Sequence, residues 1–252
     1  MFADLAFFSL LRITDPAGHR AYNEWHQLDH RPINLALPGI AWGDRWARPE
    51  SYAALSRGTG QYALADYLAM YWFRPPVAES VAAWTALGED SFQWGRGPLI
   101  PDVERSLLAF FRPVKGYASP HVLVDQEALP FRPNRGLHVT LTRYQSPHGA
   151  DTHRAFGHED RELIPALLRV HGVAGAWTFA FSHPQRHATL PFDETPDAPQ
   201  GSMRIRLLYL DEDPLAVTPE IAAVEEREGP AAPGAEVLLS TPLKTIIPWQ
   251  DW

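Results

Sequence analysis

Residues 5–47 read LAFFSLLRITDPAGHRAYNEWHQLDHRPINLALPGIAWGDRWA and contain the first three elements of the predicted fold. The apolar run at 5–14 predicts a strand by residue type. The Asp-Pro step at 15–16 is typical of a helix start, with Asp as N-cap and Pro in the first turn. The Pro-Gly step at 38–39 ends that helix, and residues 40–47 predict a second strand. The segment therefore predicts a strand–helix–strand unit.

The same kinds of element continue along the chain. Further strands are predicted at 66–73, 106–113, 137–144, 173–182, 204–210 and 236–247, and further helices at 77–88, 151–170 and 214–228. The order corresponds to two β-α-β-β-α-β units, at residues 1–114 and 136–252. Residues 115–135 have the proline and polar content of a connector between them.

Matches at a fixed separation support an internal repeat. One sequence offset relates Gly39 to Gly172, Pro32 to Pro165, Ala41 to Ala174 and Ile40 to Val173, and a slightly longer offset relates Tyr71 to Tyr209 and Pro76 to Pro214. A proline late in the first helix of both halves is a specific feature, because it removes a helix hydrogen bond and bends the chain. The repeated order and spacing indicate a duplicated unit.

The strands are apolar on both faces. In the first strand Leu5, Phe7, Leu11 and Ile13 share one face, and Ala6, Phe8 and Leu10 share the other. An antiparallel sheet with one solvated face alternates apolar and polar residues, so both faces are expected to be covered. Helices cover only one face, and the sheet of the other half can cover the second. We therefore predict an α+β fold with two ferredoxin-like repeats packed sheet to sheet as a single barrel.

Composition excludes several classes of protein. The 252 residues are 45% hydrophobic and carry a formal net charge of −8, which gives no attraction to nucleic acid or anionic lipid. No cysteine is present, so disulfides, thiolate metal sites and cysteine nucleophiles are excluded, and a reducing cytoplasm is expected. The N-terminus predicts a strand rather than a signal peptide, and no segment has the roughly 20 apolar residues of a membrane helix.

Several motifs resemble a known family. The stretch YNEWHQLDHRPINLALPGIAWGDRW followed by ADYLAMYWFRPPVAESVAAWTAL is similar to the dimeric α/β-barrel superfamily, within it to the EthD-like and related uncharacterised members. The shared features are Trp25, Asp29-His30-Arg31-Pro32, Leu37-Pro38-Gly39, the Tyr-rich run 67–71 and Trp84. The second half has Glu162-Leu163-Ile164-Pro165 in place of Asp29-His30-Arg31-Pro32, which places a duplicated active site in doubt. The resemblance implies the barrel fold and a family that includes monooxygenases, cyclases, isomerases and haem enzymes.

The first helix carries the main candidate site. Tyr22, His26 and His30 are spaced i, i+4, i+8 and form one stripe. His26 or His30 is expected to transfer a proton, with Asp29 orienting the ring as a carboxylate does for a general base. Tyr22 and Trp25 are expected to contact substrate. The alternative is that these polar residues face solvent or join the end of the helix to a loop.

Two further residues complete this candidate site. Tyr71 and Trp72 are expected to line the pocket. A metal held by His26 and His30 would need a third ligand, and the loop residues His183 and His187 raise the number of histidines without supplying a defined site, so no metal is predicted.

The second half has a different polar pattern. His138, Thr140, Thr142 and Tyr144 share one strand face, and Arg204 and Arg206 share a face on another strand. If this face is enclosed, the two guanidinium groups form a pocket suited to a carboxylate or enolate. If it faces solvent, it is an ordinary solvent-exposed face of the sheet.

Three functions remain open on the sequence. The first is a cofactor-independent enzyme acting on a small apolar or aromatic carbonyl-type substrate by proton transfer, as a cyclase, isomerase or monooxygenase-like protein. The second is a haem protein, because LLRVHGVAG at 167–175 is similar to the proximal-histidine segment of the chlorite dismutase family, which implies His171 as axial ligand. The third is a non-catalytic small-molecule-binding or structural barrel. A monomer with an internal pseudo-dimer is expected, with a higher homo-oligomer as the alternative.

Overall fold

The structure is a computed structural model that describes residues 2–96, 102–186, 195–229 and 232–250. Its strands are β1 (Leu5–Ile13), β2 (Ile40–Ala47), β3 (Arg57–Gly58), β4 (Tyr67–Phe73), β5 (Val103–Ala118), β6 (Gly136–Tyr144), β7 (Val173–Pro184), β8 (Met203–Leu210) and β9 (Ala235–Thr245). They form one antiparallel sheet in the order β2-β4-β1-β5-β7-β8-β6-β9-β3. A further pairing of β2 with β9 closes the long strands into a ring.

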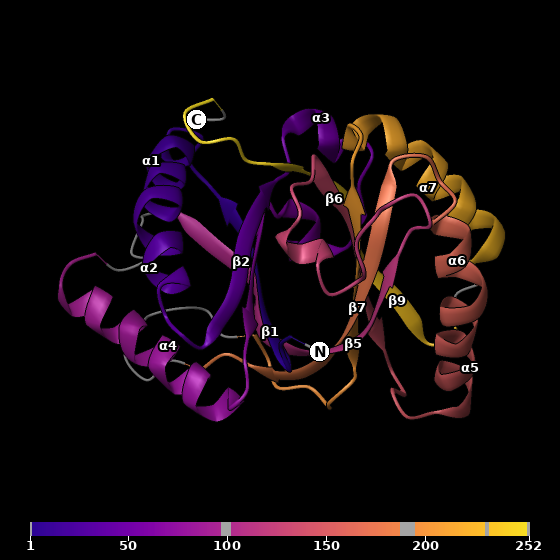
Figure 1. Ribbon diagram of the computed structural model, residues 1–252, viewed down its shortest axis with the longest axis horizontal. Helices are drawn as coiled ribbons and strands as arrows, with labels where there is room; N and C mark the ends of the chain where they lie inside the picture. The colour runs from indigo at the N-terminus through magenta and orange to yellow at the C-terminus, as the bar shows by residue number, and fades with distance from the viewer. Residues whose placement is uncertain (1, 97–101, 187–194, 230–231, 251–252) are drawn as a thin grey trace.

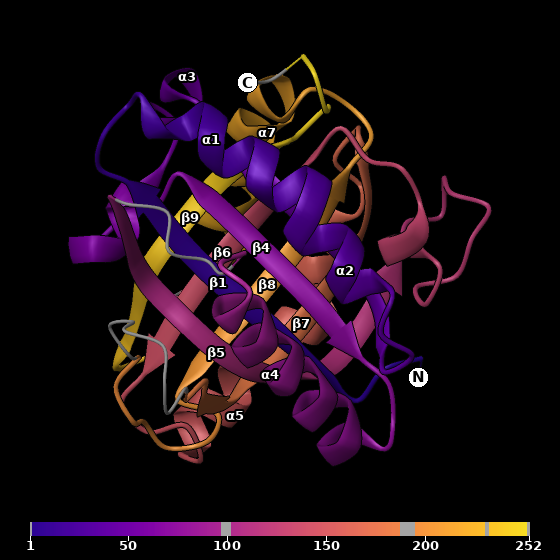
Figure 2. The ribbon, with the colours of Figure 1, turned by 90° about the vertical axis from the view of Figure 1, so that its left-hand side faces the viewer.

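The longer helices lie outside this ring on two opposite sides, and the short helices and turns lie in the connections between strands (Figure 1). They are α1 (Gly18–Trp25), the π-helical turn η1 (His26–His30), α2 (Arg31–Leu35), α3 (Glu50–Ala53), the 3-10 turn η2 (Gly60–Leu64), α4 (Val77–Gln93), the 3-10 turn η3 (Leu129–Phe131), α5 (Ala150–His158), the π-helical turn η4 (Glu159–Leu163), α6 (Ile164–Leu167) and α7 (Pro214–Glu228). Viewed from the side, α1, α2 and α4 lie over the strands of the first half and run in much the same direction as β1 and β4 (Figure 2). Within the described residues no helix combines the length and apolar character needed to cross a bilayer.

The inside of the ring is a filled apolar core. Its largest side chains come from both halves of the chain and include Phe8, Trp72, Phe111, Trp177 and Phe179, all with at most 2% of their surface exposed. Trp72 and Trp177 meet edge to face with centroids 5.2 Å apart, a geometry that aromatic pairs favour. The centre of the ring is therefore packed with side chains, and any ligand site must lie elsewhere.

The other face of the sheet packs against the helices. Every residue of β4 is buried, and its side chains alternate between the inner core and the helix layer, as expected for strands covered on both faces. The expected equivalence of Tyr71 and Tyr209 is wrong, because Tyr71 faces the helix layer and Tyr209 faces the inner core. Ile40 pairs with Phe73 and Val173 pairs with Leu210, so β4 and β8 align with Phe73 matched to Leu210 and Tyr71 matched to Leu208.

The first helix of each half, α1–η1–α2 and α5–η4–α6, contains one wide π-helical turn at the same position. The N–H of Arg31 bonds to the carbonyl of His26, and the N–H of Ile164 bonds to the carbonyl of Glu159, so each turn spans one residue more than an α-helical turn. Pro32 follows the first wide turn, at the start of α2, and Pro165 follows the second, at the start of α6. Proline has no N–H to give to the preceding turn, so the widened turn lies where the regular ladder is already interrupted.

The structure has more secondary structure than predicted in two segments. β5 continues to Ala118, beyond the start of the predicted connector at 115–135. The segment 48–65, which carries no predicted element, contains α3, β3 and η2. β3 pairs with β9 through Arg57 and Gly58, and this brings a guanidinium of the first half against the second half.

Candidate functional site

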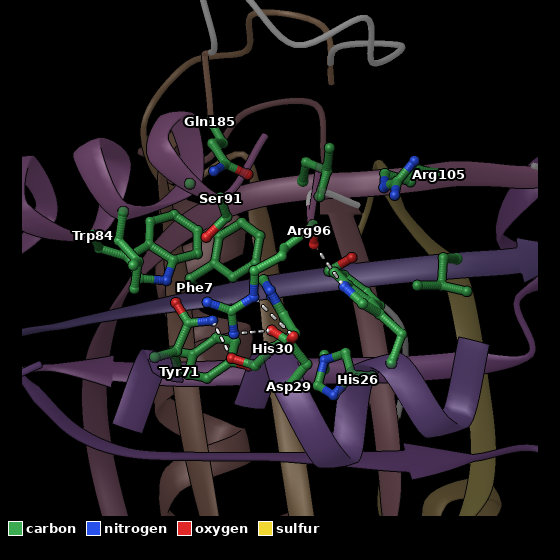
Figure 3. A pocket seen from close by; sticks show the side chains of 18 of the residues that line it. Phe7, His26, Asp29, His30, Tyr71, Trp84, Ser91, Arg96, Arg105 and Gln185 are labelled. Carbon is green, nitrogen blue, oxygen red and sulfur yellow. Dashed lines mark hydrogen bonds and ion pairs between the residues drawn. The ribbon is translucent and has the colours of Figure 1, made fainter. Parts of the chain in front are cut away.

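A cavity of about 90 Å³ lies between the helix-facing side of the first-half strands and the helices above them (Figure 3). Its walls come from β1, β4 and β5, from the α1–η1–α2 helix, from α4 and from the segment after β7. The lining residues are Phe7, Ser9, Leu11, Tyr22, Trp25, His26, Asp29, His30, Asn34, Ala69, Tyr71, Trp84, Leu87, Gly88, Ser91, Arg96, Arg105, Leu108 and Gln185. The site therefore combines aromatic walls with a small number of polar groups, as small-molecule sites usually do.

The stripe on the first helix lines this cavity. Tyr22 and His26 have ring centroids 5.9 Å apart, and His26 and His30 have centroids 5.1 Å apart. The Trp25 indole stacks on the His30 ring with centroids 4.5 Å apart and planes inclined by 24°. The structure thus brings Tyr22, Trp25, His26 and His30 to one wall, so a stripe that faces solvent is excluded for Tyr22 and His26. The second alternative, that this helix is joined to a loop, is met by the contact of Trp25 with Arg96.

Both histidines of the stripe are neutral near pH 7. His26 is buried, its Nδ1 has no hydrogen-bond partner, and burial followed by the charge of Arg45 holds its pKa well below the usual range. A part of His30 reaches solvent, but its ring lies between Trp25 and Tyr71, and the loss of water around the ring lowers its pKa to about 4. A neutral imidazole can accept a proton, so both rings are in the form that a general base requires.

Arg45 on β2 lies beside the histidine stripe, and the sequence analysis did not single it out. Its side chain is fully buried under α1, its Nη2 donates to Asn23 Oδ1 at 2.6 Å, and its guanidinium lies 4.7 Å from the Tyr22 ring centroid and 4.5 Å from that of Tyr67. Its Nε and Nη1 have no hydrogen-bond partner. Cation–π contacts replace the carboxylate that usually accompanies a buried guanidinium. The available signal was a charged residue next to Trp46 in a strand whose two faces are both covered, at a position that faces the helix layer.

Two buried donors lie in the opposite wall. The Tyr71 hydroxyl and the Trp84 indole N–H have no hydrogen-bond partner, and the two ring centroids are 6.2 Å apart. The Tyr71 ring packs over Gly43 of the neighbouring strand, where a Cβ atom would come within 2.2 Å of its Cδ1. Burial raises the pKa of Tyr71 far above its usual value, so this hydroxyl stays protonated. Buried donors without a partner are costly, which makes them candidates for contact with a ligand acceptor.

Asp29 does not orient a histidine as expected. Its carboxylate accepts two hydrogen bonds from Arg96, at 3.0 and 2.8 Å, and the Trp25 indole N–H donates to the Arg96 carbonyl at 3.0 Å (Figure 3). The chain after α4 places the Arg96 guanidinium over η1, where it binds both carboxylate oxygens. Asp29 therefore joins η1 to the end of α4 beside the cavity, and it affects His30 through its charge alone.

Three predicted substrate contacts lie elsewhere. Trp72 points into the inner core because neighbouring residues of a strand face opposite sides, so it is separated from Tyr71 by the sheet. Arg204 and Arg206 are 8% and 6% exposed and lie in the second half, so the interpretation of their strand face as a wet surface is wrong. They line a separate cavity of about 690 Å³ together with Glu159 and Glu225.

The other histidines considered from the sequence are His171, His183 and His187, and neither His171 nor His183 lines this cavity. His171 is exposed in the turn between α6 and β7, and it lines neither of these two cavities. His183 stacks on Phe110 with centroids 4.8 Å apart, and His187 lies outside the described residues. Within the described part of the chain, no group of three or more histidine, aspartate or glutamate side chains is arranged to hold a metal ion.

Comparison with known proteins identifies the fold. No protein-family model and no curated protein sequence matches this chain. A proposed monooxygenase from Fusobacterium nucleatum superposes with a TM-score of 0.53 at 7% identity, over 98% of this chain and 94% of that one. A dye-decolorizing protein from V. cholerae gives 0.50 at 9% identity, over 96% and 94% of the two chains. A proposed chlorite dismutase gives 0.50 at 12% identity, over 96% and 95%. These neighbours belong to the dimeric α/β-barrel superfamily, and at such identities the likeness establishes a shared α+β fold and nothing about chemistry.

Proposed function

We propose that this protein is a cofactor-independent enzyme that transfers a proton on a small aromatic carbonyl-type substrate, with the first-half cavity as its active site. The observation that carries the proposal is a wall with two neutral imidazoles facing a wall with two buried donors that have no protein partner. Such a pairing of proton acceptor and oxyanion donors is what enolate formation requires. The wider proposal is an EthD-like tandem fusion of units 1–114 and 136–252.

Repeated irregularities support the tandem fusion. The strand order β2-β4-β1-β5 in the first half has the same pattern as β7-β8-β6-β9 in the second. The π-helical turns at His26–His30 and Glu159–Leu163 are separated by the same sequence offset as Gly39 and Gly172. The register shifts between Ile40 and Trp42 and between Val173 and Gly175 are separated by this offset too. Bulges and wide turns are not required by strand or helix formation as such, so their recurrence at one spacing favours duplication.

The proposed proton transfer assigns a role to each group. The substrate carbonyl oxygen accepts hydrogen bonds from the Tyr71 hydroxyl and the Trp84 N–H, which acidifies the adjacent C–H bond. The His26 ring takes the proton, and the electrons of the C–H bond become those of the enolate. As negative charge forms on the substrate, it raises the pKa of His26 and favours the transfer. Return of the proton from His26 to the same carbon restores the ketone. In a β,γ-unsaturated ketone, its return to the γ carbon moves the double bond and completes an isomerisation.

The size of the cavity limits the substrate. A volume of about 90 Å³ is smaller than the engineered cavity of about 150 Å³ that admits benzene. The partly exposed side chains of Trp25 and His30 form one wall, and their movement can admit a single ring. We therefore expect substrates of one aromatic ring bearing a carbonyl group, and weaker binding of fused-ring compounds.

Proton abstraction can be measured directly by exchange with deuterium. Aryl alkyl ketones are incubated with the protein in D2O, and loss of the proton next to the carbonyl is followed by NMR. We expect His26→Asn to abolish exchange, and Trp84→Phe to slow it by roughly 10²-fold or more, in the range for one lost oxyanion donor. Trp72→Phe is the matched control, because Trp72 is also buried with a free indole N–H but faces the inner core. Exchange that persists in His26→Asn would overturn the proposal.

The haem alternative is not supported by the residues present. His171 is exposed and is not among the residues that line either cavity. The larger cavity contains the imidazole of His158, but its Nε2 lies within hydrogen-bond distance of the Glu228 carbonyl. The floor of that cavity is a network of charged groups, whereas a porphyrin face requires apolar contacts.

A single chain is expected to be sufficient for the fold. The inner sheet faces already cover each other, so the chain does not need a second copy to bury them. We propose a monomer located in the cytoplasm. Light scattering on the purified protein measures the mass directly, and a dimer at micromolar concentration would contradict this part of the proposal.

A further inference from the structure

The first-half cavity lies above two small residues that are side by side on β1 and β4. Ser9 pairs with Ala69 in the antiparallel register, and both line the cavity from the sheet. The neighbouring positions of the two strands on the same face carry large side chains, namely Phe7, Leu11, Tyr67 and Tyr71. A serine and an alanine fill less space than these neighbours, so the sheet leaves room for a ligand ring at the level of this pair.

The cavity has polar groups at both of its ends along the strands. At one end, the Trp84 ring centroid is 4.9 Å from that of Phe7 and 6.2 Å from that of Tyr71, and the free donors of Trp84 and Tyr71 lie here (Figure 3). At the other end, the Tyr22 ring centroid is 5.3 Å from that of Tyr67. Because a strand rises by about 3.3 Å per residue, the levels of Tyr67 and Tyr71 on β4 are about 13 Å apart. A ligand that reaches both ends must therefore carry its polar groups on opposite sides of its ring.

Ser9 and Tyr22 bring to this cavity two hydroxyl groups that the protein itself does not use. Ser9 is 7% exposed and Tyr22 is 2% exposed. Among the described residues neither hydroxyl has a hydrogen-bond partner, and neither is enclosed by protein atoms as the Tyr71 hydroxyl is, so both open into the cavity that they line. Burial raises the pKa of Tyr22 against the opposing charges of Arg45 and Arg105, so its phenol stays protonated. A ligand hydroxyl, which both donates and accepts, can satisfy two such groups.

The separation of the two ends sets the length of the ligand. A hydrogen bond to a hydroxyl group is about 2.8 Å long, so one such bond at each end accounts for roughly 6 Å of the span. About 7 Å then remains between the two polar atoms of the ligand. The oxygen atoms of an aryl ketone with a hydroxyl group on the opposite ring carbon are separated by a distance of this size. A hydroxyl group on the ring carbon next to the ketone would not reach the Tyr22 end.

We propose that this site selects aryl ketones that carry a hydroxyl group on the ring carbon opposite the ketone. The carbonyl oxygen lies at Tyr71 and Trp84, and the ring lies over the small side chain of Ala69. The ring hydroxyl is hydrogen-bonded to the side chains of Ser9 and Tyr22, which are therefore specificity-determining residues. This inference rests on the site of the proposed function, but it concerns the choice of ligand and not the transfer of a proton.

Calorimetry with 4-hydroxyacetophenone and 4-fluoroacetophenone tests the proposal on the full chain. The two ligands share the aryl ketone, and fluorine is close to a hydroxyl group in size but donates no hydrogen bond. We expect 4-hydroxyacetophenone to bind with a dissociation constant lower by at least about tenfold, as two gained hydrogen bonds provide. Ser9→Ala and Tyr22→Phe each remove one hydroxyl group with little change in shape, and each is expected to reduce this preference by at least about threefold.

Ser106→Ala is the matched control, because it removes a buried hydroxyl that donates to the Leu10 carbonyl and does not line this cavity. It is expected to leave the preference for 4-hydroxyacetophenone unchanged. Equal affinity of the wild type for the two ligands overturns the inference, even if deuterium exchange is observed. An unchanged preference in both Ser9→Ala and Tyr22→Phe also overturns it, as does the lack of binding of either ligand at millimolar concentration. If the preference is found but neither ligand exchanges deuterium, the proposed proton transfer is wrong and the inference on ligand selection stands.

Discussion

Lowering the pH from 7 to 5 should destabilise this protein through its buried histidines. His138 on β6 is 2% exposed, and burial, the largest cause, lowers its pKa to about 4, with Glu225 opposing this and Arg206 and Arg57 adding to it. In the unfolded chain a histidine has a pKa of about 6.5. Between these values the unfolded chain binds more protons than the folded protein. The free energy of unfolding therefore falls as pH drops below about 6.5, and the loss is complete below about 4.

The size of the effect follows from the two pKa values. A shift from about 6.5 to about 4 changes the free energy of unfolding by about 2 kcal/mol between pH 7 and pH 5 for His138. His30 has the same folded-state pKa of about 4, but part of the residue reaches solvent, so its contribution is at most as large. His26 adds a loss of the same sign. A loss of a few kcal/mol is a large fraction of the roughly 5–15 kcal/mol that typically stabilises a domain.

Urea denaturation at pH 7, 6 and 5 measures this loss. The test compares the loss in the free energy of unfolding between the wild type and His138→Asn. Buried carboxyl groups such as Asp44 contribute equally to this loss in both proteins, so their effect cancels in the difference. We expect the variant to lose about 2 kcal/mol less than the wild type over this range. Equal losses in the two proteins would refute the reasoning, since His138 would then have the same pKa in the folded and unfolded states.

Three further predictions concern the packing around the site. Gly43→Ala is expected to lower the free energy of unfolding, measured by urea denaturation, by about 1–3 kcal/mol, because the new Cβ would lie 2.2 Å from Tyr71 Cδ1. This loss should largely vanish in a Tyr71→Ala background, and an equal loss in both backgrounds would count against the contact. Arg45→Met is expected to raise the pKa of His26 without restoring its ordinary value, because burial is the larger cause; an NMR titration of the His26 ring with an unchanged midpoint would disprove this. Trp72→Leu should lower the free energy of unfolding by up to the roughly 3–5 kcal/mol found for truncation of a buried Trp to Ala, and a loss below about 1 kcal/mol would show that the inner core is not closely packed around it.

Local sequence signals were sufficient for most elements. The Pro-Gly step at 38–39 and the apolar runs of β1, β2 and β4 predicted the bounds of these strands to within one residue. The histidine stripe on the first helix was also predicted, because spacing along a helix is a local property. The lack of a polar face on β1 and β4 indicated that both faces of the sheet are covered, and their alternating side chains do reach two different cores.

The long-range partners of these side chains were not predictable in the same way. The sequence favoured Asp29 as the partner of a histidine because it is three residues from His26, yet Arg96, far along the chain, binds both of its oxygens. Trp72 and Tyr71 are neighbours in sequence, but the pleat of β4 sends one into the inner core and the other into the cavity.

The sequence by itself determined the order of the elements, because strand and helix formation depend on residue periodicity, turn residues and caps that act over a few positions. Only the tertiary structure decided which polar groups lie together. Arg45, buried between two tyrosine rings, and the cluster of Arg204 and Arg206 with two glutamates depend on sheet register and on the helix packed above it. Those contacts join residues far apart in the chain, and no local pattern encodes the distance between them.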